Sequence, residues 1–163
     1  MADQLLAIDP GNQESAYCLI DVATCRPEQH AKVPNAELLA LIQEEGWAPS
    51  WAAVEMVASY GMAVGADVFE TCVWIGRFAQ ALTDAGVKPQ LVKRLPVKLH
   101  LCHSAKATDA NIRQALVDRF ASGLPNGGKG TKAAPGWFYG FAGDVWAAYA
   151  LAVYAADQEA ARA

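Results

Sequence analysis

Three single carboxylates interrupt otherwise apolar segments, and they constrain the fold more than any other feature of this chain. Asp9 ends the apolar run 5–8. Glu55 lies inside the apolar stretch 51–58, and Asp144 begins an alanine-rich stretch with helical character. An unpaired charge in a dry core is very costly, so three such acids need a common explanation. Convergence on divalent metal ions supplies one, because carboxylate oxygens are hard ligands that suit Mg²⁺ or Mn²⁺.

Each acid also has a simpler interpretation. Asp9 precedes Pro10 and Gly11, and all three residue types are common in turns. Glu55 would be tolerated as a charge on an edge strand. Asp144 would be favoured as a helix N-cap by the helix dipole. The residues alone leave these alternatives open.

Apolar runs, helical spacing and turn residues predict one α/β domain covering residues 1–163, because this length suits a single core. Strands are predicted over 4–8, 15–22, 28–33, 51–58 and 89–93. Helices are predicted over 36–45, with Asn35 as N-cap and Gly46 as the stop, over 67–85 and 109–121, and from Asp144 to about Asp157. The order β-β-β-α-β-α-β-α-α predicts a mixed five-stranded sheet with helices on both faces. The four scattered cysteines are expected to be reduced.

Charge is unevenly distributed along the chain. The whole chain carries −4, but the segment 88–132 holds nine Lys or Arg and only two Asp. A basic segment beside an acidic remainder favours a protein that holds a polyanion at one place, although a solvated basic face is the alternative. The side chains expected to contact nucleic acid are Lys93, Arg94, Lys98, Lys106, Arg113, Lys129, Lys132 and Trp137.

The loop 123–139 joins glycines to lysines and aromatic residues. Its backbone amides, with Lys129 and Lys132, would grip DNA phosphates, and Trp137 would stack on unpaired bases. Packing of the aromatic residues beneath the last helix is an equally open alternative. The loop lacks the spacing of a nucleotide-binding loop, so no nucleotide cofactor is expected. No window of about 18 apolar residues is present, so no membrane partner is expected.

The helix predicted over 67–85 is apolar over more of its circumference than one buried stripe needs. A surplus apolar face predicts a partner surface, and complete burial within the monomer is the alternative. The residues that make up this wide apolar face are Val68, Phe69, Cys72, Val73, Trp74, Ile75, Phe78 and Leu82.

Four segments, in order, resemble RuvC-type Holliday junction resolvases of the RNase H-like superfamily. The run 5–11 followed by 15–20 is similar to the first hairpin of that family, which ends its first strand in Ile-Asp-Pro-Gly. Residues 54–57 are similar to the second acidic strand, 106–116 to the helix before the last acid, and 144–152 to the last helix. The resemblance covers nearly the whole chain and looks most like the compact RuvC-like resolvases carried by bacteriophages.

The resemblance implies an RNase H-like fold and a metal-dependent, structure-selective DNA endonuclease that cleaves four-way junctions. It implies that Asp9, Glu55 and Asp144 bind two Mg²⁺ or Mn²⁺ ions, that the protein is a homodimer, and that it acts in the bacterial cytoplasm. Other branched DNA, RNA–DNA hybrids, or a catalytically weakened junction-binding module are the alternatives.

One departure from the family pattern concerns the last helix. The family places a second metal-binding residue three positions after the first, and that position is Ala147 here. A fourth ligand is therefore missing or comes from elsewhere in the chain. The candidates are Asp109, Glu70, Asp67 and Glu14.

Overall fold

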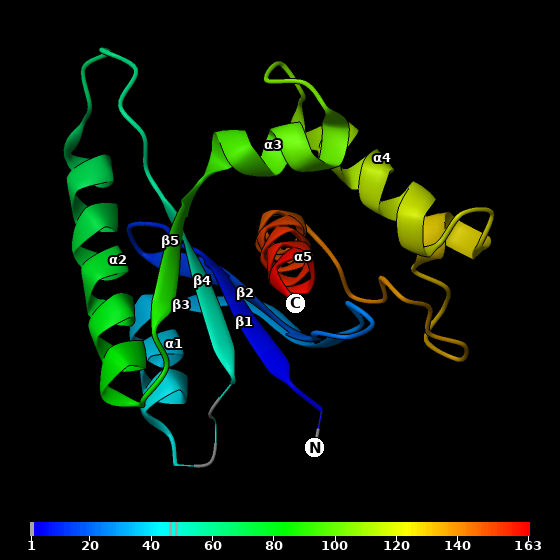
Figure 1. Cartoon of the computed structure of the whole chain (residues 1–163), viewed down its shortest axis with the longest axis horizontal. Coiled ribbons are helices and arrows are strands. Elements are labelled where there is room, and N and C mark those ends of the chain that lie inside the picture. The colour runs from blue at the N-terminus through cyan, green and yellow to red at the C-terminus, as the bar shows by residue number, and fades with distance from the viewer. Residues whose placement is uncertain (1, 46, 48) are drawn as a thin grey trace.

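Five strands form one mixed sheet in the computed structural model, which describes residues 2–45, 47 and 49–163 (Figure 1). The strands are β1 (Gln4–Asp9), β2 (Glu14–Asp21), β3 (Pro27–Pro34), β4 (Trp51–Met56) and β5 (Pro89–Lys93), in the spatial order β3-β2-β1-β4-β5. The first three form an antiparallel meander, and β4 and β5 add in parallel to β1. The predicted mixed five-stranded sheet is confirmed.

Helices cover both faces of the sheet, as predicted. On one face lie α1 (Asn35–Gln43) and α2 (Ala66–Asp84). On the other lies α5 (Val145–Arg162), which Figure 1 views end-on between the sheet and the pair α3 (Arg94–Cys102) and α4 (Asp109–Phe120). A short 3₁₀ helix, η1 (Pro125–Gly128), follows α4. None of the helices among the described residues is long and apolar enough to cross a membrane.

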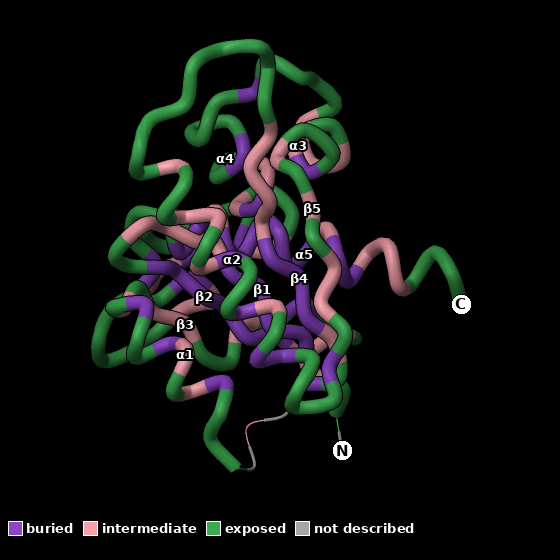
Figure 2. The backbone as a smooth tube through the Cα atoms, turned by 90° about the vertical axis from the view of Figure 1, so that its left-hand side faces the viewer, coloured by how far each residue is buried: buried purple, intermediate pink, exposed green. Residues whose placement is uncertain are grey.

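Alternation along the strands divides the core into two clusters, one for each face. Leu5 and Ala7 of β1 pack against α5, whereas Leu6 and Ile8 pack against α1 and α2. Figure 2 shows that burial is concentrated in the sheet and α5, while the last residues of the chain are exposed. Because the side chains alternate, the residue after Ile8 points toward α5.

Helix α3 is absent from the predicted order of elements. Pro96 lies in its first turn, where the backbone N–H groups have no partner within the helix and proline is tolerated. The apolar residues of this segment alternate with other residues, which is the spacing typical of a strand: Leu95, Val97, Leu99 and Leu101. The chain thus enters α3 directly from β5 at Arg94.

Asn35 is the first residue of α1 and does not cap it as predicted. Its buried side chain accepts a hydrogen bond from the Ser15 hydroxyl (2.6 Å) and donates one to the Gly11 carbonyl (2.9 Å). A Cβ at Gly11 would collide with the carbonyl oxygen of Glu14, so the turn requires glycine there. These contacts hold the turn that follows Asp9. Gly46, the expected stop of this helix, lies outside the described residues.

The Tyr149 side chain ties α5 to the segments around it. Its buried hydroxyl donates to the Cys25 carbonyl (2.8 Å) and accepts from the Trp137 indole N–H (3.0 Å). Cys25, like the other three cysteines, is a free thiol, as predicted.

Replacing Tyr149 by phenylalanine should lower the free energy of unfolding by about 1–3 kcal/mol, because both hydrogen-bond partners would lose their buried bond. Urea denaturation measures the effect. Tyr139→Phe is the matched control, since that side chain is 43% exposed. Equal stabilities of the two variants would contradict the assigned role of the Tyr149 hydroxyl.

Candidate metal and DNA-binding site

Strand pairing brings Asp9 and Glu55 together. In the parallel pair β1–β4, Ile8 is opposite Val54, and the next residue of each strand is an acid. Both acids follow residues that face α1 and α2, so both side chains point to the opposite face, beneath α5. Glu55 lies on an internal strand, between β1 and β5, which removes its interpretation as an edge-strand charge.

The neighbouring carboxyl groups strongly perturb Asp9. Burial, contact with the Glu55 carboxyl and the nearby charge of Asp144 raise the pKa of Asp9 from its usual 3.8 to about 9, and Arg94 opposes this shift. Both acids can be ionised together near neutral pH only if a positive charge compensates their repulsion. A divalent cation fits such oxygen donors in type and charge.

Asp144 immediately precedes α5, and its side chain makes no capping hydrogen bond to that helix. Its carboxylate instead accepts a bond from the Lys32 ammonium, with Nζ 2.7 Å from Oδ2. Asp144 and Asp9 line one cavity of about 360 Å³, together with Asp109 and Ala147. The three predicted acids thus gather around the start of α5.

Arg94 begins α3 and lies between two acids. Its guanidinium donates to Glu55 (Nη1–Oε1, 3.5 Å) and to Asp109. Within the described part of the chain, no three Asp, Glu, His or Cys side chains converge closely enough to form a ready-made metal cluster. The ion pairs of Arg94 with Glu55 and of Lys32 with Asp144 account for this, since each directs a carboxylate toward a cation of the protein.

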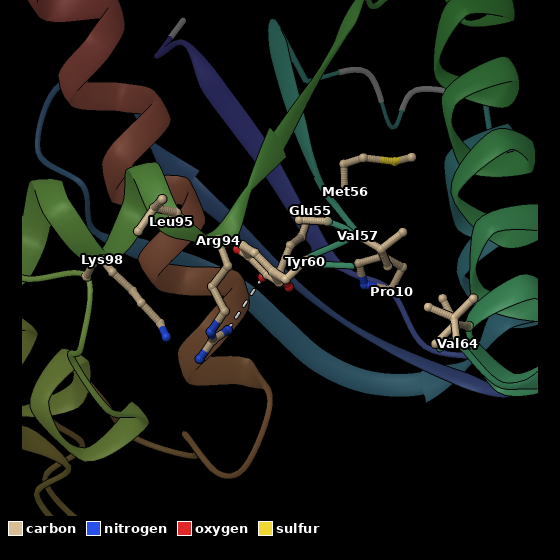
Figure 3. A pocket seen from close by; sticks show the side chains of 12 residues that line it. Pro10, Glu55, Met56, Val57, Tyr60, Val64, Arg94, Leu95 and Lys98 are labelled. Atoms are coloured by element: carbon tan, nitrogen blue, oxygen red, sulfur yellow. Dashed lines mark hydrogen bonds and ion pairs between the residues drawn. The ribbon is translucent and has the colours of Figure 1, made fainter. Parts of the chain in front are cut away.

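A larger cavity of about 690 Å³ adjoins Glu55 (Figure 3). Arg94 and Lys98 reach it from α3 on one side. Met56, at the end of β4, and Val64, from the segment between β4 and α2, line the other side. Two cavities therefore adjoin the acids. The smaller one is more polar, and the larger one is mainly apolar with the basic side chains of α3 at its edge.

The predicted DNA-binding residues are divided among several places. Arg94 and Arg113 line the acidic cavity, and Lys98 lines the apolar one. Lys93 pairs in register with Met56, so it points to the face of β5 opposite Glu55. The others are exposed or half-exposed: Lys106 lies before α4, and Lys129 and Lys132 lie in the loop after η1. Arg94 is held by carboxylates of the site, which differs from its expected role as a free DNA contact.

Trp137 does not present a free stacking surface, which corrects its expected role. Its ring stacks on Phe120, with centroids 5.3 Å apart, and the Arg26 guanidinium lies 5.4 Å from its centre. The neighbouring Phe138 is fully buried. The alternative, packing of these aromatic residues beneath the last helix, describes Phe138, which contacts α5, whereas Tyr139 is exposed.

Lys32 is a site residue that the sequence did not reveal. It belongs to β3, where Ala16 of β2 is its register partner, and Ala16 is in turn the partner of Asp9. Sequence spacing identifies β3 as a strand, but it does not give the pairing that brings Lys32 toward the acids.

The exposed face of α2 partly agrees with the expectation from its sequence. Ile75, Phe78 and Leu82 are buried against the sheet, whereas Phe69 and Val73 are each 62% exposed. Two large apolar side chains of α2 thus face solvent.

The chain matches no protein-family model and no curated protein sequence. Its fold is similar to a solved structure of Thermus thermophilus RuvC, with a TM-score of 0.68 and 19% identity over 97% of this chain and 96% of that one. It is also similar to T. thermophilus RuvC in complex with Holliday junction substrate, with a TM-score of 0.66 and 18% identity over 97% and 96% of the two chains. The chain therefore has a RuvC-like fold over nearly its whole length.

The raised pKa of Asp9 predicts how the stability of the metal-free protein changes with pH. Between its usual pKa of 3.8 and the folded value of about 9, the folded protein holds a proton that the unfolded chain has lost. Stability therefore falls as pH rises through this range. Asp9→Asn removes this titration. In EDTA, its melting temperature relative to that of the wild type should therefore increase from pH 4 to pH 8.

Thermal unfolding at several pH values, with the exposed Asp84→Asn as control, measures this difference. If the difference in melting temperature between Asp9→Asn and the wild type does not change with pH, the pKa of Asp9 is not raised in the folded protein.

Proposed function

We propose that this protein is a RuvC-type, metal-dependent endonuclease that cleaves Holliday junctions. The observation that carries the proposal is the contact of Asp9 with Glu55 on neighbouring parallel strands, beneath the start of α5 at Asp144. The RuvC-like fold supports it, and one of the similar structures is RuvC in complex with Holliday junction substrate. Such an enzyme would act in the cytoplasm of a bacterial cell.

Asp9, Glu55 and Asp144 would hold the metal ions. Two Mg²⁺ or Mn²⁺ ions, when bound, would activate a water molecule and stabilise the leaving oxygen of the cleaved phosphodiester. The protein contributes oxygen ligands on a rigid sheet, and Asp9 is half-buried at the end of β1. Arg113 and Lys98, at the two cavities, would bind phosphates on either side of the cleaved bond.

Branched DNA fits the distribution of charge. Lys93, Lys106, Lys129 and Lys132 lie outside the two cavities and would contact the backbone of the junction arms. A homodimer fits the substrate, because a four-way junction must be cut symmetrically in two strands. Phe69 and Val73 on α2 provide the apolar surface for the second copy.

The proposed activity is tested with labelled four-way junction, duplex and RNA–DNA hybrid, in Mg²⁺, Mn²⁺ or EDTA. Wild-type protein should cleave the junction only with metal. Asp9→Asn and Glu55→Gln should reduce cleavage by more than about 100-fold, since even outer-shell changes at metal sites cost about 10- to 100-fold. Both variants should still bind the junction, because basic side chains supply most of the binding free energy.

Asp84→Asn serves as the control and should cleave normally. An Asp9→Asn protein that cuts at the wild-type rate would refute the assigned site. Equal cleavage of hybrid and junction would instead favour an RNase H-like nuclease of broader substrate range.

Ala147 favours a second candidate, a junction-binding module with weakened catalysis. The residue lies one turn after Asp144 and lines both the acidic cavity and a small void beside Glu55. A carboxylate at this position would face the proposed metals, and its absence leaves the site one charge short of the family pattern.

Ala147→Asp should lower the Mg²⁺ concentration needed for half-maximal cleavage, because the added carboxylate supplies a fourth ligand. Ala160→Asp, on the exposed last turn of α5, is the matched control. Metal titrations of cleavage, with melting curves for each variant, measure the outcome. A lower melting temperature without a gain in activity would mean that Ala147 contributes only to the packing of α5.

A further inference from the structure

Lys32 belongs to the same cross-strand row as the acids. Asp9 pairs in register with Ala16, and Ala16 pairs with Lys32. Directly opposed residues of neighbouring strands share a face of the sheet, so all three side chains point toward α5. With strands about 4.8 Å apart, Lys32 begins roughly 10 Å from Asp9 along this row.

Ala16, between them, is fully buried and contributes only a methyl group to this row. The long, flexible Lys32 side chain reaches the start of α5 and places Nζ 2.7 Å from the Asp144 carboxylate. This contact joins residues 112 positions apart in the sequence.

The contact uses the carboxylate that the proposed function requires for a metal ion. Both side chains are about half exposed, at 46% for Lys32 and 53% for Asp144. Ion pairs of this exposure are weak, so a divalent cation beside Asp9 and Glu55 can compete for the same oxygen atoms. Once released, the Lys32 ammonium has three donors available for an acceptor beside Asp144.

We propose that Lys32 is a positioning residue that exchanges partners, holding the Asp144 carboxylate in the metal-free site and a DNA phosphate in the loaded one. The inference rests on the proposed function and adds a residue to it. In this scheme Lys32 weakens metal binding when DNA is absent and strengthens DNA binding when metal is present. Binding of the metal and binding of DNA therefore each strengthen the other through the Lys32 side chain.

Direct binding measurements test both halves of the exchange. Mn²⁺ binding to the DNA-free protein, followed by electron paramagnetic resonance, should be about two- to fivefold tighter for Lys32→Met, which is the range expected from an exposed ion pair. Junction binding in Ca²⁺ should lose about one unit of salt slope, since one phosphate contact disappears. Lys32→Arg should keep the wild-type slope.

Lys88→Met is the matched control, because it removes the same charge at the opposite end of β5 from the site. Equal Mn²⁺ affinities of Lys32→Met and Lys88→Met, or an unchanged salt slope for Lys32→Met, would overturn the exchange. If the wild type binds Mn²⁺ and cleaves junctions, such a result rejects the role of Lys32 alone. A wild type that binds no Mn²⁺ would reject the proposed function as well.

Discussion

The contact between Asp9 and Glu55 is the constraint on which the site depends. The two carboxyl groups lie close together because β1 and β4 are parallel and in register, and partial burial of Asp9 makes their repulsion costly. A shift of register by one residue would turn an acid to the other face of the sheet. The apolar clusters on both faces prevent such a shift, and the turn held by Asn35 fixes the end of β1. The stability of the sheet thus maintains an unfavourable local interaction that a bound cation would relieve.

The surrounding cations act on this pair from two sides. Arg94 approaches from α3 and Lys32 from β3, and each binds a different carboxylate of the proposed ligand set. Both cations therefore partly neutralise the acids in the metal-free protein. This arrangement also explains why a basic segment and an acidic site coexist in one small protein. The basic side chains nearest the acids neutralise part of their charge, and those farther away would bind the DNA backbone.

The acids were accessible from sequence because their signal is local. A charge within an apolar run is visible without any knowledge of the fold. As predicted, Asp9 ends a strand, Glu55 lies inside one, and Asp144 comes at the start of the last helix. The strands were predicted to within two residues for the same reason, since their alternation and their turns are encoded in short windows.

The remaining features depend on tertiary structure. The apolar residues of helix α3 alternate along the sequence from Leu95 to Leu101, a strand-like spacing, although Val97 alone is buried in the helix. The role of Lys32 follows from the register of three strands. Trp137 follows a glycine-rich loop, which suggests exposure, yet its ring packs on Phe120 from α4. In each case the partner is distant in sequence, and only the folded chain identifies it.

The location of bound metal tests the central claim most directly. Crystals of the protein grown with Mn²⁺ would show the ion by its anomalous scattering. The account predicts a peak in contact with both Asp9 and Glu55, with the Asp144 carboxylate turned from Lys32 toward the ion. Absence of a peak at Asp9 and Glu55, at Mn²⁺ concentrations that saturate the protein, would contradict it.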